Sequence, residues 1–237
     1  MHEITVSWAK LQFPDKWTDM YEREIWYQVS CPEGGIAIDI GAHYGFYTTK
    51  LAREAGSEGK VLAFEPNDTN RGIMESNLKR NDLDAGVSIY DCALSDYEGT
   101  GALFTYEQDG NDSGKHFLRG SLDQEAFYKE YNQGKSAPYP QYDTQIAVTT
   151  LDNVASEMSR IDLIKIDVEG AELRVLKGAR SVLEKHSPRI VIEVHHDQIE
   201  VLTDLLSELN YSIAIYYSKV TGSTNPFAVF EKKKESI

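Results

Sequence analysis

Short apolar runs alternate with longer amphipathic stretches along most of this 237-residue chain, and this alternation limits its fold more than any other feature. The pattern predicts strands over 36–40, 60–65, 87–91, 145–149, 163–167 and 189–194, with helices over 46–55, 68–81, 170–185 and 197–209. Asp68 is the expected N-cap of the second helix. Two last apolar segments, 212–217 and 227–231, flank a polar stretch with Gly and Pro and predict a hairpin. Strands alternating with helices indicate an α/β fold with a mainly parallel sheet.

Two segments depart from this alternation. Residues 1–34 contain all three tryptophans, and aromatic residues spaced three to five apart predict an N-terminal helical cap. A lid over a ligand is the alternative. The stretch from about 106 to 142 is rich in Gly, Asn, Asp, Ser, Tyr and Pro, with a short helix expected over 122–131. Loops beyond about 12 to 15 residues are uncommon unless functional or disordered. We therefore expect a substrate-side insertion within a main domain spanning 35–237, with a flexible decoration as the alternative.

Composition and charge exclude several classes of protein. A hydrophobic content of 41% is that of a folded domain, and no apolar run approaches the ~20 residues that span a bilayer. Without a recognisable leader, a soluble cytoplasmic monomer or homodimer is expected. The net charge of −14 opposes general nucleic-acid binding. Cys31 and Cys92 are too few and too isolated for a disulfide framework or zinc cluster.

The turn between the first strand and its helix has the character of a nucleotide-type binding unit. It reads Asp39-Ile40-Gly41-Ala42-His43-Tyr44-Gly45. Gly41 permits a tight turn and close approach of a ligand, and the helix after Gly45 offers free backbone N–H groups. The dinucleotide fingerprint G-x-G-x-x-G is not met, because position 43 is His. The turn predicts a cofactor without deciding which one.

Acids at the ends of the next two strands extend this candidate site. Glu65 closes the second strand, where a carboxylate can accept both ribose hydroxyl protons, and Pro66-Asn67 follow it. Asp91 closes the third strand and precedes Cys92-Ala93, which suits an adenine on an apolar ledge with Asp91 near its amino group. In open α/β sheets the ligand crevice lies outside the carboxyl ends of the strands. We therefore expect these acids to share one edge.

The acidic rim helps to choose the cofactor. Pyrophosphate cofactors favour helix dipoles and basic side chains, whereas S-adenosylmethionine has no phosphate and carries a positive sulfonium. The rim therefore favours S-adenosylmethionine. A nucleotide-dependent oxidoreductase is the first rival, although it should show the tighter glycine turn and a Tyr/Lys pair for hydride transfer. The second rival is a non-catalytic binding protein that retains the fold.

With these residues in place, the chain resembles the FkbM-type methyltransferases, a branch of the class I methyltransferase superfamily. The matching segments are residues 38–48, Phe64-Glu65-Pro66-Asn67, Asp91-Cys92-Ala93-Leu94-Ser95, Thr150-Leu151-Asp152, and 163–172, which reads LIKIDVEGAE. The resemblance implies a Rossmann-like seven-stranded sheet with helices on both faces. It also implies S-adenosylmethionine as methyl donor and a hydroxyl oxygen as acceptor. His43 is a departure, because members of this family generally carry Asn there.

The reactive end is expected at the next two strand ends. Asp167 closes one strand, where it could hold the methionine amino group, orient the acceptor or bind a metal. Alternation places Glu193 and His195 on one face of the following strand. Removal of a hydroxyl proton suits His, so His195 is the predicted general base. A metal-free site is favoured, with Asp167, Glu193 and His195 as the ligands if a divalent metal binds. The expected acceptor is a small molecule or glycan hydroxyl.

Overall fold

The computed structural model describes residues 23–108, 111–118, 141–195, 198–220, 223 and 225–233. For 23, 104–108, 111–118 and 141–143 it describes the backbone alone. The predicted helix over 122–131 and most of the predicted cap over 1–34 lie outside these residues. From that cap, helix α2 (Arg23–Trp26) is described, and its Trp26 ring packs 4.8 Å from the ring of Phe46.

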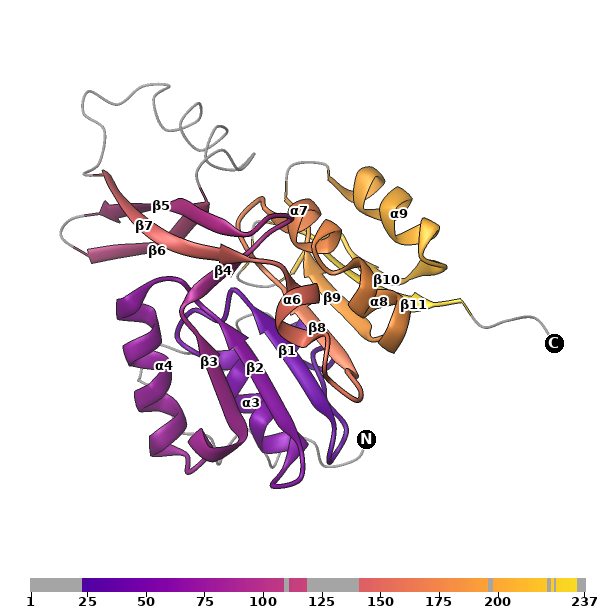
Figure 1. Cartoon of the computed structure of the whole chain (residues 1–237), viewed down its shortest axis with the longest axis horizontal. Helices are drawn as coiled ribbons and strands as arrows, with labels where there is room; N and C mark the ends of the chain where they lie inside the picture. The colour runs from indigo at the N-terminus through magenta and orange to yellow at the C-terminus, as the bar shows by residue number, and fades with distance from the viewer. Residues whose placement is uncertain are drawn as a thin grey trace.

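A seven-stranded sheet forms the centre of the molecule, with strand order β10-β11-β9-β8-β1-β2-β3 (Figure 1). Its strands are β1 (Ile36–Ile40), β2 (Lys60–Phe64), β3 (Val87–Tyr90), β8 (Leu163–Ile166), β9 (Arg189–Glu193), β10 (Tyr211–Tyr217) and β11 (Phe227–Lys232). The run from β3 to β9 is parallel, and β11 pairs antiparallel with both β9 and β10. This arrangement confirms the predicted α/β fold with its C-terminal antiparallel hairpin.

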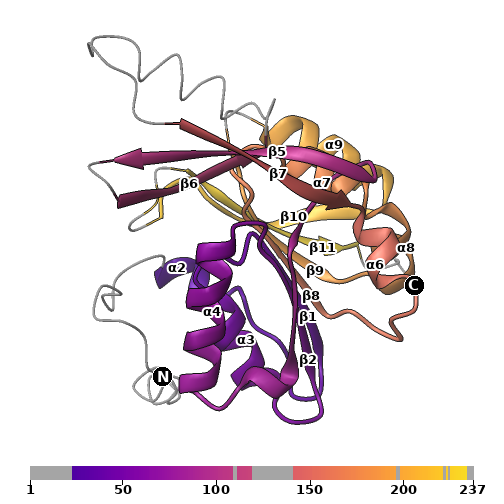
Figure 2. The ribbon, with the colours of Figure 1, turned by 60° about the vertical axis from the view of Figure 1, so that its left-hand side comes forward.

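Helices cover both faces of the main sheet (Figures 1 and 2). They are α3 (Phe46–Ala55), α4 (Asp68–Arg80), the 3-10 turn η1 (Asp84–Gly86), α6 (Leu151–Ala155), α7 (Glu172–Lys177), α8 (Arg180–His186) and α9 (Ile199–Glu208). Successive residues of β1 point to opposite faces. Ile38 and Ile40 therefore join one core with residues of α6 to α9, while Ala37 joins a second core with residues of α2 and α3. No described helix has both the length and the apolar character needed to cross a bilayer.

Two predicted helix boundaries are wrong. Asn67, rather than Asp68, caps α4, because its side chain accepts a hydrogen bond of 3.0 Å from the Asn70 N–H. The helix predicted over 170–185 is divided into α7 and α8 at Gly178. A Cβ atom at Gly178 would lie 2.0 Å from the carbonyl oxygen of Ser95. The close approach of these two backbones is a long-range feature that helical periodicity does not reveal.

A second sheet starts at the carboxyl edge of the main one, where β4 (Cys92–Leu94) follows β3. It contains β5 (Gly99–Gln108), β6 (Asn111–Leu118) and β7 (Gln141–Thr149), in the order β4-β7-β5-β6. Where these strands run, the stretch from about 106 to 142 is strand rather than loop, and its role as a substrate-side insertion stays a prediction. Figure 2 shows the second sheet extending beyond the main sheet on this side.

Asp152, part of the Thr-Leu-Asp motif, stabilises the start of α8. Its two carboxylate oxygens accept hydrogen bonds of 3.0 and 2.9 Å from the N–H groups of Ser181 and Val182. The N-cap residue itself, Ala179, has no side-chain hydrogen bond. We therefore expect Asp152→Ala to lower the free energy of unfolding by about 2 kcal/mol. Urea denaturation will measure this change, and cofactor affinity should stay unchanged. An unaltered unfolding midpoint would show that water replaces these bonds without cost.

Candidate active site

The glycine turn is held between the ends of β2 and β8. The N–H groups of Gly41 and Ala42 both donate to the carbonyl oxygen of Phe64, each at 3.0 Å. Gly41 has a φ of 76°, and a Cβ atom there would lie 1.7 Å from the carbonyl oxygen of Asp167. Only glycine therefore fits at this position. The fold thus brings the turn into backbone contact with Asp167, which lies far away in sequence.

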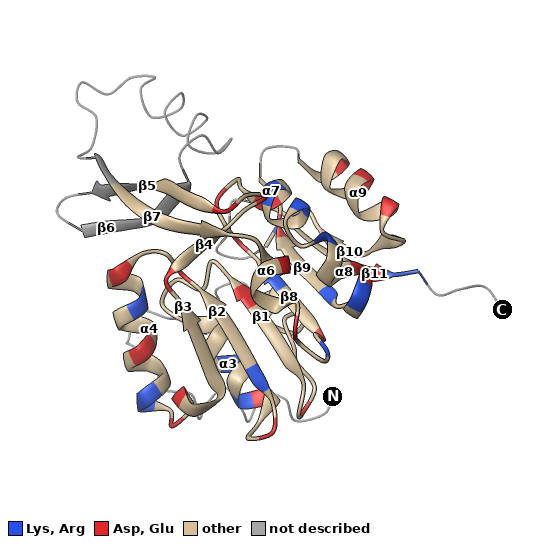
Figure 3. Ribbon diagram, in the orientation of Figure 1, with Lys and Arg blue, Asp and Glu red and all other residues tan. Residues whose placement is uncertain are grey.

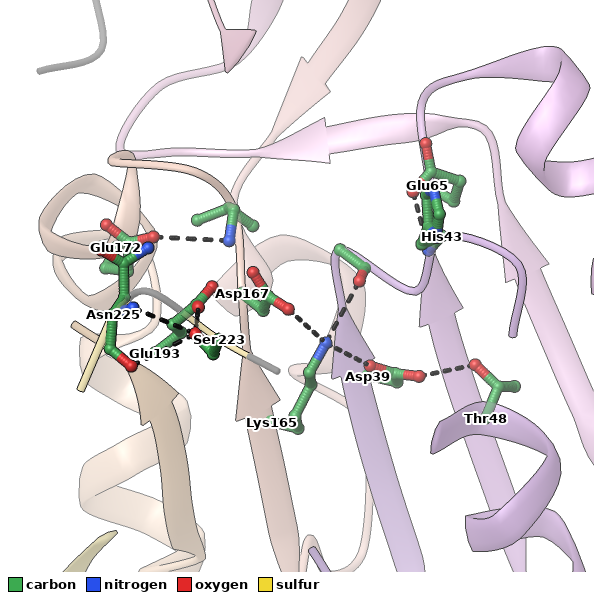
Figure 4. A network of polar contacts seen from close by, with 12 residues as sticks. Asp39, His43, Thr48, Glu65, Lys165, Asp167, Glu172, Glu193, Ser223 and Asn225 are labelled. Atoms are coloured by element: carbon green, nitrogen blue, oxygen red, sulfur yellow. Dashed lines mark hydrogen bonds and ion pairs between the residues drawn. The ribbon is translucent and has the colours of Figure 1, made fainter. Parts of the chain in front are cut away.

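Beneath the turn, a buried lysine joins two aspartates (Figure 4). Lys165 Nζ lies 3.6 Å from Asp39 Oδ1 and 3.3 Å from Asp167 Oδ2, and donates to the carbonyl oxygen of Gly41 at 3.2 Å. Thr48 Oγ1 donates to the other Asp39 oxygen at 2.6 Å. Asp39 is fully buried. Its carboxylate therefore supports the turn through Lys165, which contacts both Asp39 and the Gly41 carbonyl oxygen.

Sequence reasoning did not select Lys165 as a site residue. A signal was available, because Lys165 lies within the apolar run Leu163–Ile166 of a strand that is buried on both faces. Lysine is almost never fully buried unless it is paired. A lysine within such a strand therefore predicts a nearby carboxylate, and Asp39 is its register partner on β1.

Glu65 connects the turn to α4. Its Oε2 accepts a hydrogen bond of 2.9 Å from the His43 N–H, and its Oε1 accepts one of 2.9 Å from the Asn67 N–H. Burial raises the pKa of Glu65, although the hydrogen bonds from Asn67 and His43 oppose the shift. Among the described residues Oε2 accepts this one bond, and a carboxylate oxygen can accept two. A ribose hydroxyl therefore fits here as a further donor.

The residues predicted to contact adenine lie where β3 passes into β4. Asp91 lies exposed between β3 and β4, next to the buried Cys92. Burial and the neighbouring Asp91 raise the pKa of the Cys92 thiol to about 11, so the thiol is neutral. The rings of Phe64 and Tyr90 stack at 4.6 Å under this part of the edge. Figure 3 shows acidic residues in red along the same edge of the main sheet.

At the far side of the turn, the structure brings Asp167, Glu193 and His195 together. His195 Nε2 lies 3.0 Å from Glu193 Oε2, and one ligand atom from each of the three residues lies within 4.8 Å of the others. Burial and the Glu193 charge raise the pKa of Asp167 to about 6. Burial acts to raise the pKa of Glu193, but hydrogen bonds with His195 and Asp167 outweigh it and lower the pKa to about 2. We call these three residues the acceptor cluster.

Two residues of the C-terminal hairpin complete this region. Ser223 Oγ donates to Glu193 Oε1 at 2.7 Å, and Asn225 Nδ2 lies 3.1 Å from His195 Nδ1 (Figure 4 shows Ser223, Asn225 and Glu193). Sequence reasoning missed both, because nothing in the connection between β10 and β11 indicates that it reaches the end of β9.

The parallel sheet, the glycine turn and the strand-end acids define a Rossmann-like domain of the kind that binds adenosine cofactors. The family model of the methyltransferase FkbM domain matches residues 39–213. The chain therefore belongs to the FkbM family of S-adenosylmethionine-dependent methyltransferases, as its motifs predicted.

The chain is also similar to two curated proteins and to a solved structure. Methyltransferase sdnD of Sordaria araneosa is 32% identical over 162 residues, which cover 62% of this chain and 61% of that protein. AMB antimetabolite synthetase AmbE of Pseudomonas aeruginosa is 26% identical over 92% of this chain and 11% of its own length. The chain thus spans less than two thirds of both relatives. The crystal structure of methyltransferase FkbM from Methylobacillus flagellatus shares the fold, with a TM-score of 0.55, 18% identity, and coverage of 87% of this chain and 50% of that one.

Proposed function

We propose that the protein transfers the methyl group of S-adenosylmethionine to a hydroxyl oxygen of a small molecule or glycan. The observation that carries this proposal is the acceptor cluster, which lies at the same sheet edge as the glycine turn and Glu65. In the reaction the hydroxyl oxygen attacks the methyl carbon, the carbon–sulfur bond breaks, and the hydroxyl proton must leave. A site of this kind needs a cofactor end and a proton-handling end side by side.

The cofactor end consists of the turn and the ends of β2 and β3. We propose that Glu65 accepts the ribose hydroxyls and that Asp91 lies near the adenine amino group. The remaining contacts come from the turn and from the residues that follow the strands, namely Gly41, Ala42, His43, Tyr44, Gly45, Pro66, Asn67, Cys92 and Ala93. The buried Asp39 supports the turn through Lys165. The acidic rim favours a cationic sulfonium over a pyrophosphate. Bound S-adenosylmethionine supplies the electrophilic methyl group, and these residues orient it.

The acceptor end consists of Asp167, Glu193 and His195. The Asp167 side chain is 24% exposed, against 9% for Glu193 and 2% for His195. Asp167 is therefore the member that an acceptor reaches first. The ring nitrogens of His195 face Glu193 and Asn225, so its role as general base requires one of these contacts to open. We propose that Asp167 contacts the acceptor. Glu193 and His195 then set the charge and the position of the Asp167 carboxylate.

The net charge of the chain and its similarity to other proteins both indicate the class of acceptor. A net charge of −14 favours neutral or cationic acceptors over nucleic acids. Similarity to one part of an antimetabolite synthetase favours a small natural product over a macromolecule. Both observations support a small polar molecule as the acceptor.

Isothermal titration with S-adenosylmethionine, S-adenosylhomocysteine and NAD tests the cofactor. We expect both adenosyl compounds to bind and NAD to give no heat. Glu65→Gln should weaken binding by roughly 10-fold or more, because loss of a charged hydrogen-bond acceptor costs about 1.5–3 kcal/mol. Glu75→Gln is the matched control, since Glu75 lies on the exposed side of α4 against Lys79. Binding of NAD alone would favour the oxidoreductase, and no heat from any of the three would favour a non-catalytic protein.

A further inference from the structure

We propose that Asp167, Glu193 and His195 bind a divalent cation, with the hydroxyl acceptor as a further ligand. Cation binding rests on the geometry of the acceptor cluster alone, whereas the cation's part in methyl transfer rests on the proposed function. The three side chains come from the ends of the adjacent parallel strands β8 and β9. They therefore converge on one point from a rigid part of the fold.

The distances within the cluster are close to those around a single metal ion. One atom of each residue lies within 4.8 Å of the other two, and His195 Nε2 and Glu193 Oε2 are 3.0 Å apart. A cation with bonds of about 2.1 Å separates neighbouring ligand atoms by about 3 Å and opposite ones by about 4.2 Å. The upper bound of 4.8 Å slightly exceeds the separation of opposite ligands, so small side-chain movements are enough to bring the three atoms into one coordination sphere.

The charges around the cluster leave a deficit of positive charge. Asp39, Asp167 and Glu193 are acidic, and Lys165 is the one lysine or arginine that the described part of the chain pairs with any of them. Its Nζ contacts Asp167 Oδ2, yet the Glu193 carboxylate lies close enough for its charge to act on Asp167. Two neighbouring carboxylates in a partly buried site repel each other unless a proton or a cation lies between them. A dication neutralises this pair directly.

The surrounding contacts orient the three side chains as metal ligands. Ser223 fixes one Glu193 oxygen, which directs the other toward His195. The Asn225 amide lies 3.1 Å from His195 Nδ1. With its amide turned over, Asn225 presents oxygen to an Nδ1–H group, which leaves the Nε2 lone pair for the cation. Ligating histidines are commonly held in this way by a partner on their second nitrogen.

The ligand set indicates which cations fit. Two carboxylates suit Mg²⁺ and Mn²⁺, and one imidazole shifts the preference toward Mn²⁺. Three protein ligands leave positions open for water and for the acceptor oxygen. A bound cation lowers the pKa of the hydroxyl, so its proton passes to water as the oxygen attacks the methyl carbon. The products are then the methyl ether, S-adenosylhomocysteine and a proton.

Mn²⁺ itself is the probe that tests this site, titrated into the chelator-treated full chain and followed by electron paramagnetic resonance. We expect one bound Mn²⁺ per chain. Glu193→Gln and His195→Ala should each weaken binding at least 10-fold, while His186→Gln, at the end of α8, should bind like the unmodified chain. Circular dichroism and S-adenosylmethionine affinity will show whether each variant has folded.

The outcomes separate this inference from the proposed function. Stoichiometric Mn²⁺ binding that depends on Glu193 and His195 supports the site even if no methyl transfer is found. No Mn²⁺ binding to the unmodified chain overturns it, and so does binding that all the folded variants retain. If the chelator-treated chain methylates a hydroxyl at an undiminished rate and binds no Mn²⁺, the proposed function stands without the cation.

Discussion

Gly41→Ala is expected to destabilise the protein by about 3–5 kcal/mol, the sum of backbone strain and overpacking. The φ of 76° is unfavourable for alanine, and the added methyl carbon would lie 1.7 Å from the Asp167 carbonyl oxygen. Neither partner can yield easily, because both are backbone atoms at the ends of central strands. Since a domain is stable by only about 5–15 kcal/mol, this loss removes a large fraction of the total stability. Urea denaturation and soluble yield will measure the loss.

Three other glycines separate the two causes of this effect. Gly34 has a φ of 69° with nothing within 4 Å of an added Cβ, so Gly34→Ala isolates the strain. Gly178 has a φ of −82°, and its added Cβ would lie 2.0 Å from the Ser95 carbonyl oxygen, so Gly178→Ala isolates the clash. Gly72, in the open part of α4, has neither problem, and alanine there should stabilise by about 1 kcal/mol. If Gly41→Ala costs no more than Gly34→Ala, the predicted contact with Asp167 does not limit stability.

The main sheet could be predicted because its determinants are local. Its central strands are buried on both faces and read as short apolar runs, as Lys60–Phe64 does. Helix ends carry their own signals, such as Gly56 after α3. For the strands of the main sheet, predicted and observed bounds therefore agree to within one residue.

In the second sheet the same signals predicted only the end of β7, as a strand over 145–149. Its strand β5 contains two glycines and several polar residues, and it pairs with β7 across the segment 109–140. Such pairing depends on contacts between distant residues, which no local period records. The break at Gly178 has a similar origin, because it follows from contact with Ser95.

The candidate site was found where each residue closes a strand. Asp39, Glu65 and Asp167 all lie at strand ends, and the topology of a parallel sheet places such positions at one edge. Other residues of the site were missed. Lys165 lies on β8 in register with Asp39 but within an apolar run, and Ser223 and Asn225 lie in a hairpin connection. Sequence patterns thus locate the edge of the sheet, while the partners of each side chain emerge only in three dimensions.

Lys165→Met is expected to cost about 3–5 kcal/mol, the usual penalty for leaving buried charges without their partner. Methionine keeps much of the volume but removes the ammonium group that lies 3.6 Å from Asp39 and 3.3 Å from Asp167. It also removes the hydrogen bond to the Gly41 carbonyl oxygen, so the turn loses its support from below. S-adenosylmethionine affinity should therefore fall together with stability. Thermal unfolding and isothermal titration will measure both effects.

Lys50→Met is the matched control, because Lys50 is also buried but pairs with Glu54 on α3, away from the turn. Glu54 is 28% exposed and can be solvated once its partner is lost, so this variant should lose less stability and keep its cofactor affinity. Adding Asp39→Asn to Lys165→Met removes a charge that the lysine compensated. The double variant should be more stable, by about 1 kcal/mol or more, than the sum of the stability losses of the two single variants predicts. Strict additivity would mean that Lys165 does not neutralise Asp39, and that the turn rests on other contacts.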